Sequence, residues 1–227
     1  MDRAAVERLV RDARSQGKIP DLRRVELGGL DLSGIDLRGA NLGEADLYRT
    51  TLAGANFYEA NLVFANLMKA DLTGANFTGA NMVFANLRLA TFAGSTLTRA
   101  NLSAVDATAA DFSAANLSAA NLSEANFTEA TLAGATLASA ILTEACFSGG
   151  NLSRADLRAA NLTDADLTEA MLAKAIFSKQ TVWVVNFDPI AAGAIQEKRW
   201  FAPIERLVES FLKEKGSSSI DITDPKS

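Results

Sequence analysis

The five residues Ala40-Asn41-Leu42-Gly43-Glu44 are one unit of a repeat that continues in register from Val25 to Lys179. The repeat comprises 155 residues in 31 units. We number the positions of each unit one to five, so that Leu42 occupies the third. The third position is Leu in 22 units and Phe in seven, the first is mostly Ala, and the second is mostly Asn, Asp or Thr. A fixed period over most of a chain is typical of repeat architectures.

A period of five fits neither regular element. In an α-helix, third-position residues would drift around the axis and form no continuous apolar face. In a flat strand they would alternate between the two faces. A chain that turns a corner after each unit directs every third-position side chain to one axis, and Asn, Asp, Gly, Ser and Thr tolerate such corners. The pattern therefore predicts a solenoid.

The stretches Ala40-Asn41-Leu42-Gly43-Glu44 and Ala125-Asn126-Phe127-Thr128-Glu129 resemble the signature of the pentapeptide-repeat family. The resemblance spans about two thirds of the chain and implies an all-β solenoid, a right-handed quadrilateral β-helix with four units per coil. Nearly eight coils at the strand-to-strand spacing would make a rod about 37 Å long. The uninterrupted, alanine-rich frame is similar to that of long cyanobacterial members.

With 20 residues per coil, residues 20 apart should lie above one another. The phenylalanines should then stack in the core as Phe57 on Phe77, Phe92 on Phe112 and Phe127 on Phe147. The second positions 41, 61, 81, 101 and 121 are all Asn and would form an amide ladder between coils.

The ends of an open solenoid need cover, because exposed edges invite end-to-end growth. We expect a capping helix within residues 1–20, with its helical pattern over residues 2–16. The β-helix would occupy 21–182, with Thr181–Val185 as its last strand and a turn or short helix over Phe187–Ala194. Residues 183–215 would form a C-terminal helical cap, and the polar tail 216–227 would be disordered. The alternative role of the C-terminal segment is homodimerisation, so the chain is expected to be a monomer or a homodimer.

Composition excludes several function classes. The chain has no histidine, one cysteine and a net charge of −5. Ser-His-Asp and Cys-His machinery, His/Cys zinc sites and intrachain disulfides are therefore excluded, and we expect no catalytic, cofactor or metal site. The acidic balance argues against nucleic-acid binding. No apolar run reaches membrane-spanning length and the N-terminus lacks a signal-peptide core, so a cytoplasmic protein without membrane association is expected.

The candidate functional residues break the rule that fourth and fifth positions are small or polar. They stack on successive coils or lie around the next corner, and should form one exposed apolar patch. The predicted patch consists of Tyr48, Val63, Phe64, Met68, Val83, Phe84 and Leu89. The leading hypothesis is a non-enzymatic interaction rod that docks an unidentified protein partner here, and a purely structural spacer is an alternative.

Acidic residues form a second pattern, in the C-terminal half of the repeat. The predicted acidic stripe consists of Glu124, Glu129, Glu144, Asp164 and Glu169. The resemblance gives this stripe a meaning, because resistance members of the family imitate DNA and bind type II topoisomerases such as gyrase. A DNA-mimic of this length would need on the order of 20 negative charges, and interrupting arginines weaken the imitation. DNA mimicry is therefore the first alternative to the docking hypothesis, ahead of the purely structural spacer.

Overall fold

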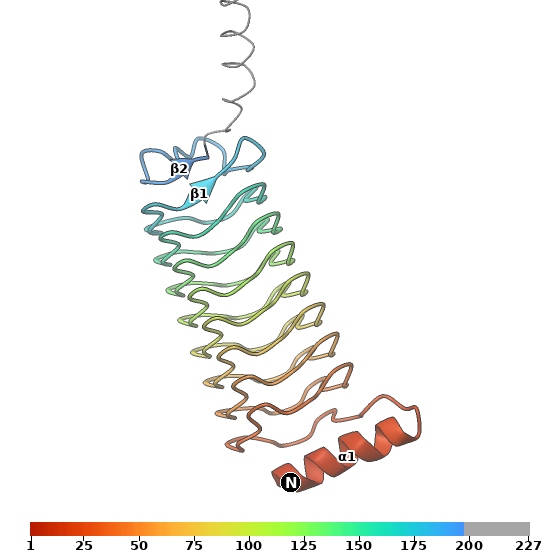
Figure 1. The fold of residues 1–227 in the computed structure, drawn as a ribbon. Helices are drawn as coiled ribbons and strands as arrows, with labels where there is room; N and C mark the ends of the chain where they lie inside the picture. The colour runs from red at the N-terminus through yellow and green to blue at the C-terminus, as the bar shows by residue number, and fades with distance from the viewer. Residues whose placement is uncertain (198–227) are drawn as a thin grey trace, which may run out of the picture. The chain divides into compact units, whose positions relative to one another are not determined.

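The computed structural model describes residues 1–197, and within them the chain rises by one coil every 20 residues. Parallel bridges join second-position residues of successive coils in an unbroken series, from Asp21 with Asn41 to Asp156 with Ile176. The ribbon in Figure 1 shows the stacked coils. Each face of a coil contributes one bridging residue between two turns, so the coils are held by many short contacts and not by long strands.

Each corner is a tight turn with a left-handed residue at the fifth position. The N–H of Ala45 donates to the carbonyl of Leu42 at 3.0 Å, and Glu44 between them has φ 59°. A positive φ at the third of four turn residues is the geometry of a type II turn, which favours glycine. Glycine fills this position at several corners, for example Gly54 (φ 66°) and Gly74 (φ 65°).

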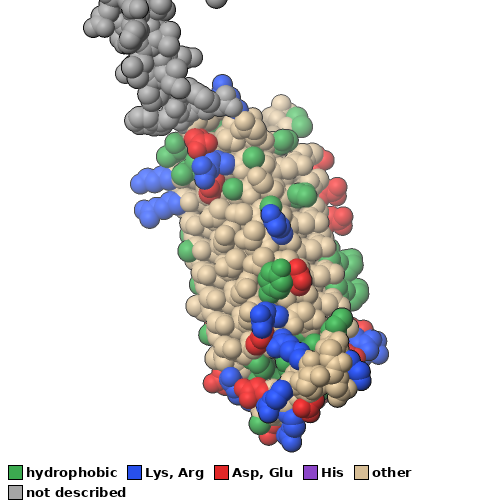
Figure 2. Space-filling view, turned by 45° about the vertical axis from the view of Figure 1, so that its right-hand side comes forward, with side chains coloured by type: hydrophobic (Ala, Val, Ile, Leu, Met, Phe, Trp, Pro, Cys, Tyr) green, Lys and Arg blue, Asp and Glu red, His purple; other side chains and the backbone are tan. Residues whose placement is uncertain are grey.

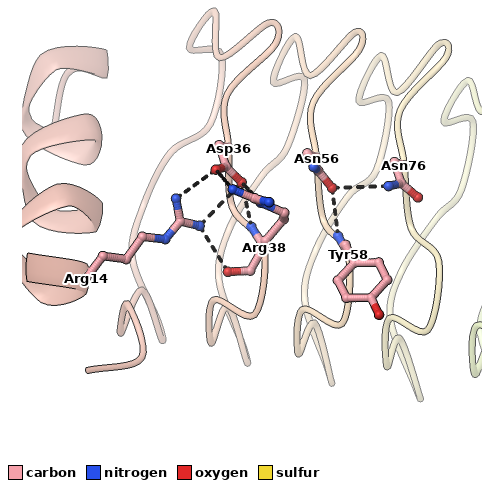
Figure 3. A network of polar contacts seen from close by, with 6 residues as sticks. All are labelled: Arg14, Asp36, Arg38, Asn56, Tyr58 and Asn76. Carbon is pink, nitrogen blue, oxygen red and sulfur yellow. Dashed lines mark hydrogen bonds and ion pairs between the residues drawn. The ribbon is translucent and has the colours of Figure 1, made fainter. Parts of the chain in front are cut away.

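The second-position side chain holds the turn from inside its own unit. The Oδ1 atom of Asn56 accepts from the backbone N–H of Tyr58 at 3.1 Å and from Nδ2 of Asn76 on the next coil at 3.2 Å (Figure 3). In most units where Ser or Thr follows as the fourth residue, its hydroxyl also donates to this acceptor, as Thr78 Oγ1 donates to Asn76 Oδ1 at 2.7 Å. This explains why Asn and Asp precede the central residue and Ser or Thr follows it.

The predicted amide ladder is mostly wrong for this reason. In the described part of the chain, the only side-chain bond along it is that of Asn61 Nδ2 with Asn41 Oδ1, at 3.0 Å. Further along, Oδ1 of Asn101 and of Asn121 accepts the hydroxyl and the N–H of the serine two residues ahead. The amide oxygens stabilise turns more than they join coils.

The core is the column of first- and third-position side chains inside the coils, nearly all without solvent exposure. The three predicted aromatic stacks are confirmed, with ring centroids 4.6 Å apart for Phe57–Phe77, 4.5 Å for Phe92–Phe112 and 5.4 Å for Phe127–Phe147. Tilted contacts of 5.4 Å (Phe77–Phe92) and 5.3 Å (Phe112–Phe127) join these pairs, so six rings form one continuous aromatic column.

The predicted N-terminal helix is present as α1, Arg3–Ser15. Its N-cap is Asp2, whose carboxylate accepts from the N–H of Ala5 at 2.8 Å, and Val6 and Val10 are buried against the core. Arg14 pairs with Asp36 at 2.8 Å and donates to the carbonyl of Arg38 at 3.0 Å (Figure 3). These contacts attach α1 to the first coil.

The C-terminal end departs from the expectation. Val182 bridges Asn161, a step of 21 residues, so the chain leaves the 20-residue register there. The predicted strand Thr181–Val185 is wrong beyond this one bridge, and Val185 is 79% exposed. Trp183 packs edge-on against Phe177, with ring centroids 5.5 Å apart.

The described chain then makes turns over part of Phe187–Ala194, where a turn or short helix was expected. It ends with β2, Ile195–Gln196, which pairs in parallel with β1, Ile176–Phe177. Residues 183–197 hold no helix. The remainder of the predicted C-terminal cap and the predicted tail 216–227 lie outside the described residues.

Candidate docking surface

The centre of the predicted patch is a pair of exposed aromatic rings on successive coils. Phe64 and Phe84 stack with centroids 5.1 Å apart and planes within 9°, and they are 59% and 54% exposed. Their backbones are fixed in one column, because Phe64 N donates to Val83 O at 3.1 Å and Phe84 N donates to Ser103 O at 3.2 Å. The coil spacing therefore sets the ring stack.

The exposed apolar residues occupy strained backbone positions. Phe64 has φ 59°, Phe84 58° and Leu89 58°. A side chain with a Cβ costs roughly 1–2 kcal/mol in this left-handed region, where Gly costs little. The fifth position projects its side chain from a corner of the coil, so large apolar residues here gain exposure at the expense of backbone strain. The frequent glycines at fifth positions were the sequence signal for this geometry.

The other predicted patch residues contribute less exposed surface. Val63, Val83 and Met68 are half-buried, and Leu89 around the corner is 46% exposed. Tyr48 is half-buried and its ring is covered by the guanidinium of Arg49, 5.1 Å from the ring centroid.

The column of the two rings ends, on the α1 side, at a neutralised charge cluster. Arg24 pairs with Glu44 at 2.9 Å, and this bond lowers the pKa of Glu44. Beside them, Arg23 pairs with Asp21 at 2.7 Å, and the hydrogen bond from Arg23 lowers the pKa of Asp21 to about 2.

On the other side, the same column continues into the predicted acidic stripe. Backbone bonds from Ala104 N to Ser123 O, Glu124 N to Thr143 O and Glu144 N to Thr163 O carry it from coil to coil. Glu124, Glu144 and Asp164 are exposed on it, and Glu129 and Glu169 are exposed at the neighbouring corner. Figure 2 shows acidic side chains in a row along one edge of the rod, with a hydrophobic group beyond them toward α1.

Other kinds of site have no support in the described part of the chain. Residues 1–197 contain no cluster of three or more His, Cys, Asp or Glu placed to hold a metal ion. Among the same residues, no helix has the length and apolar character needed to cross a membrane.

Comparison with known proteins places the chain in a family. A family model described as Pentapeptide repeats matches in eight copies, over residues 35–74, 70–108, 85–122, 110–149 and 151–179. None of the curated proteins matches the chain.

Three solved structures illustrate the likeness. A trypsin-treated form of QnrB1, a plasmid-mediated fluoroquinolone resistance protein, is 16% identical, with 88% of this chain and 100% of that chain covered and a TM-score of 0.54. HetL from the cyanobacterium Nostoc, involved in heterocyst differentiation regulation, is 36% identical over 71% of this chain and 78% of its own, with a TM-score of 0.23. A protein of the Arabidopsis thaliana thylakoid lumen is 33% identical over 52% and 68%, with a TM-score of 0.31.

The likeness to QnrB1 shows a shared fold, and pentapeptide-repeat proteins adopt a right-handed quadrilateral β-helix. The family match covers more than half of the chain. The chain therefore belongs to the pentapeptide-repeat family.

Proposed function

We propose that this protein is a non-enzymatic interaction rod that docks a protein partner through the patch centred on Phe64 and Phe84. The observation that carries the proposal is the stacked pair of half-exposed rings, each held at a strained backbone position. A contiguous exposed apolar patch often marks an interaction site, whereas single exposed apolar residues are common on protein surfaces.

The mechanism is rigid presentation. The backbone N–H of each phenylalanine is bonded to the next coil, and the two rings stack on each other, so little conformational entropy is lost when a partner covers them. Aromatic residues in a firmly packed frame are also the side chains that contribute most to binding at interfaces.

The test is a pull-down from source-organism lysate with three forms of the full chain: wild type, Phe64→Ser/Phe84→Ser, and Tyr58→Ser. Tyr58 is a matched control, since it is also an exposed aromatic residue (42%) but lies outside the patch. We expect one protein to be retained by wild type and Tyr58→Ser and lost from the double variant, with urea unfolding curves showing that all three are folded. Identical lanes would leave the purely structural spacer as the function.

The gyrase-directed DNA-mimic is the alternative. The acidic stripe supplies five exposed carboxylates, whereas a mimic of this length needs on the order of 20 charges. A gyrase supercoiling assay separates the two functions, because docking through the aromatic pair predicts no inhibition at high micromolar protein.

We also propose that α1 caps the first coil, supported by the burial of Val6 and Val10 and by the bonds of Arg3 to the carbonyl of Ser33 and of Arg14 to Asp36. Removing residues 1–16 should expose the coil edge and produce end-to-end association, measured by light scattering. A monodisperse truncated chain would contradict this role.

A further inference from the structure

The fifth-position column that carries the two rings changes chemical character in a fixed order along the rod. Beyond Phe64 and Phe84 comes the small residue Ala104, and the next three coils carry acids. These are Glu124, Glu144 and Asp164, all exposed. At about 4.8 Å per coil, Phe84 and Glu124 are about 10 Å apart, and the span from Phe64 to Asp164 is about 24 Å.

The three acids carry their charge without a protein partner. Among residues 1–197, no ion pair involves Glu124, Glu144 or Asp164, in contrast to Glu44, which Arg24 neutralises at the other end of the column. The fourth-position neighbours Ser123, Thr143 and Thr163 are uncharged. Three uncompensated negative charges therefore face solvent in a line.

Basic residues flank the aromatic end instead. Arg49 and Lys69 occupy fifth positions in the neighbouring column, on the two coils before Leu89. Backbone bonds from Arg49 N to Met68 O and from Lys69 N to Arg88 O connect these coils. Both basic residues are exposed. The corner on the other side of the rings carries one acid and one base, Glu59 and Arg99, both exposed. Positive charge is therefore in excess beside the apolar patch, and negative charge lies two to four coils beyond it.

We propose that this column binds a basic amphipathic helix of a partner protein, with apolar side chains over Phe64 and Phe84 and Lys or Arg side chains over Glu124, Glu144 and Asp164. The inference rests on the proposed function and names its partner class. A helix of about 16 residues spans 24 Å, and its 5.4 Å pitch is close to the coil spacing, so successive turns can meet successive coils. The charges would steer and orient the helix while the rings anchor it.

The probes are fluorescein-labelled helical peptides measured by fluorescence anisotropy with the full chain. The first carries Leu and Phe on one face of its first two turns and Lys on that face of its last three turns. The second replaces each Lys by Glu. We expect the Lys peptide to bind about tenfold or more tightly than the Glu peptide, the size expected of three exposed charge pairs. Its affinity should fall as NaCl is raised from roughly 50 to roughly 300 mM.

Two protein variants locate the charge effect. Glu124→Gln/Glu144→Gln/Asp164→Asn should weaken the Lys peptide by about tenfold and remove most of the salt dependence. Glu129→Gln/Glu169→Gln is the matched control, with the same kind of exposed corner one column away, and should weaken binding by less than about threefold.

Each remaining outcome decides the matter. Equal affinity for the Lys and Glu peptides, no binding of either, or equal effects of the triple and control variants would overturn the inference. If Phe64→Ser/Phe84→Ser abolishes Lys-peptide binding and the triple variant does not, the apolar docking function stands and the basic partner class is wrong. If the triple variant abolishes binding and the phenylalanine variant does not, the acids act as an unspecific cation surface and the inference fails, and the pull-down alone decides the docking function.

Discussion

Two ring pairs with nearly the same geometry, one inside the rod and one outside, allow a quantitative prediction. Phe77 and Phe64 lie on the same coil, and each stacks on a phenylalanine 20 residues away, at 4.6 Å and 5.1 Å. Phe77 is fully buried, whereas Phe64 is 59% exposed. We compare Phe77→Ala with Phe64→Ala.

The magnitudes follow from burial. Phe77→Ala removes a ring from a closed column, and such changes lower the free energy of unfolding by about 3–5 kcal/mol. Phe64→Ala loses less than half of the burial of a phenylalanine, about 1 kcal/mol, and one exposed stack, about 0.5–1 kcal/mol. The core variant should therefore be less stable than the surface variant by about 2–3 kcal/mol.

The assay is urea unfolding followed by far-UV circular dichroism, with the midpoint and slope fitted for wild type and both variants. A coil contacts only its neighbours, so a local loss should appear in the midpoint. If both variants lose the same free energy of unfolding within about 0.5 kcal/mol, the distinction between the buried ring pair of the core and the exposed ring pair of the patch is refuted. As an internal check, Phe64→Gly should exceed Phe64→Ala in stability by about 0.5–1 kcal/mol, because glycine relieves the strain at φ 59°.

Further predictions concern the turns, the charge cluster and a buried hydroxyl. Two variants in one fifth-position column test the left-handed turns. Gly74→Ala (φ 65°) should lower the free energy of unfolding by roughly 0.5–1 kcal/mol, and Ala114→Gly (φ 54°) should raise it by a similar amount. Thermal unfolding midpoints that shift in the same direction for both variants would contradict the turn geometry. Asp21 has a pKa lowered to about 2 by Arg23, so its contribution to stability is present above about pH 4 and is lost as the pH falls through 2. Arg23→Gln should reduce this step in urea unfolding at acidic pH, because the backbone N–H of residue 23 still donates to Asp21. An unchanged NMR titration of the Asp21 carboxyl would show that the side-chain pair does not form in solution. Thr50→Val removes a fully buried hydroxyl that donates to the carbonyl of Leu27 at 3.0 Å. The free energy of unfolding, measured by chemical denaturation, should fall by about 0.5–1.5 kcal/mol. An unchanged value would show that the bond is dispensable.

The period and the residue types predicted a solenoid with the third-position side chains on its axis, and the resemblance to the family supplied the 20-residue coil. Third-position side chains point to the axis, so Phe92 and Phe112 could be paired once the resemblance had supplied the coil length of 20 residues. The helix α1 was also predictable, because Asp2 and the apolar spacing of Val6 and Val10 are local signals.

Competition between neighbouring bonds was not visible in the sequence. The amide of Asn101 could have bonded the next coil, but the hydroxyl and N–H of Ser103 take its oxygen first. The extra residue between Asn161 and Val182 has no composition signal, and it displaced the predicted last strand.

Within the candidate site, the sequence placed Phe64 and Phe84 correctly on one exposed column. It could not show that Arg49 covers the ring of Tyr48 or that Val63 and Val83 are half-buried, because these depend on side-chain packing across a corner. The left-handed backbone under the exposed rings was signalled only indirectly, by the glycines at other fifth positions.

The 20-residue step has an evolutionary consequence. Insertion or loss of one residue rotates every later side chain to another position of its unit, whereas loss of a whole coil, such as residues 85–104, preserves every face and brings Phe84 directly below Glu124. The distance between any two surface groups on the rod can therefore change only in increments of about 4.8 Å. Duplication or deletion of whole coils can therefore change the spacing of surface groups in fixed steps during evolution while the core remains intact.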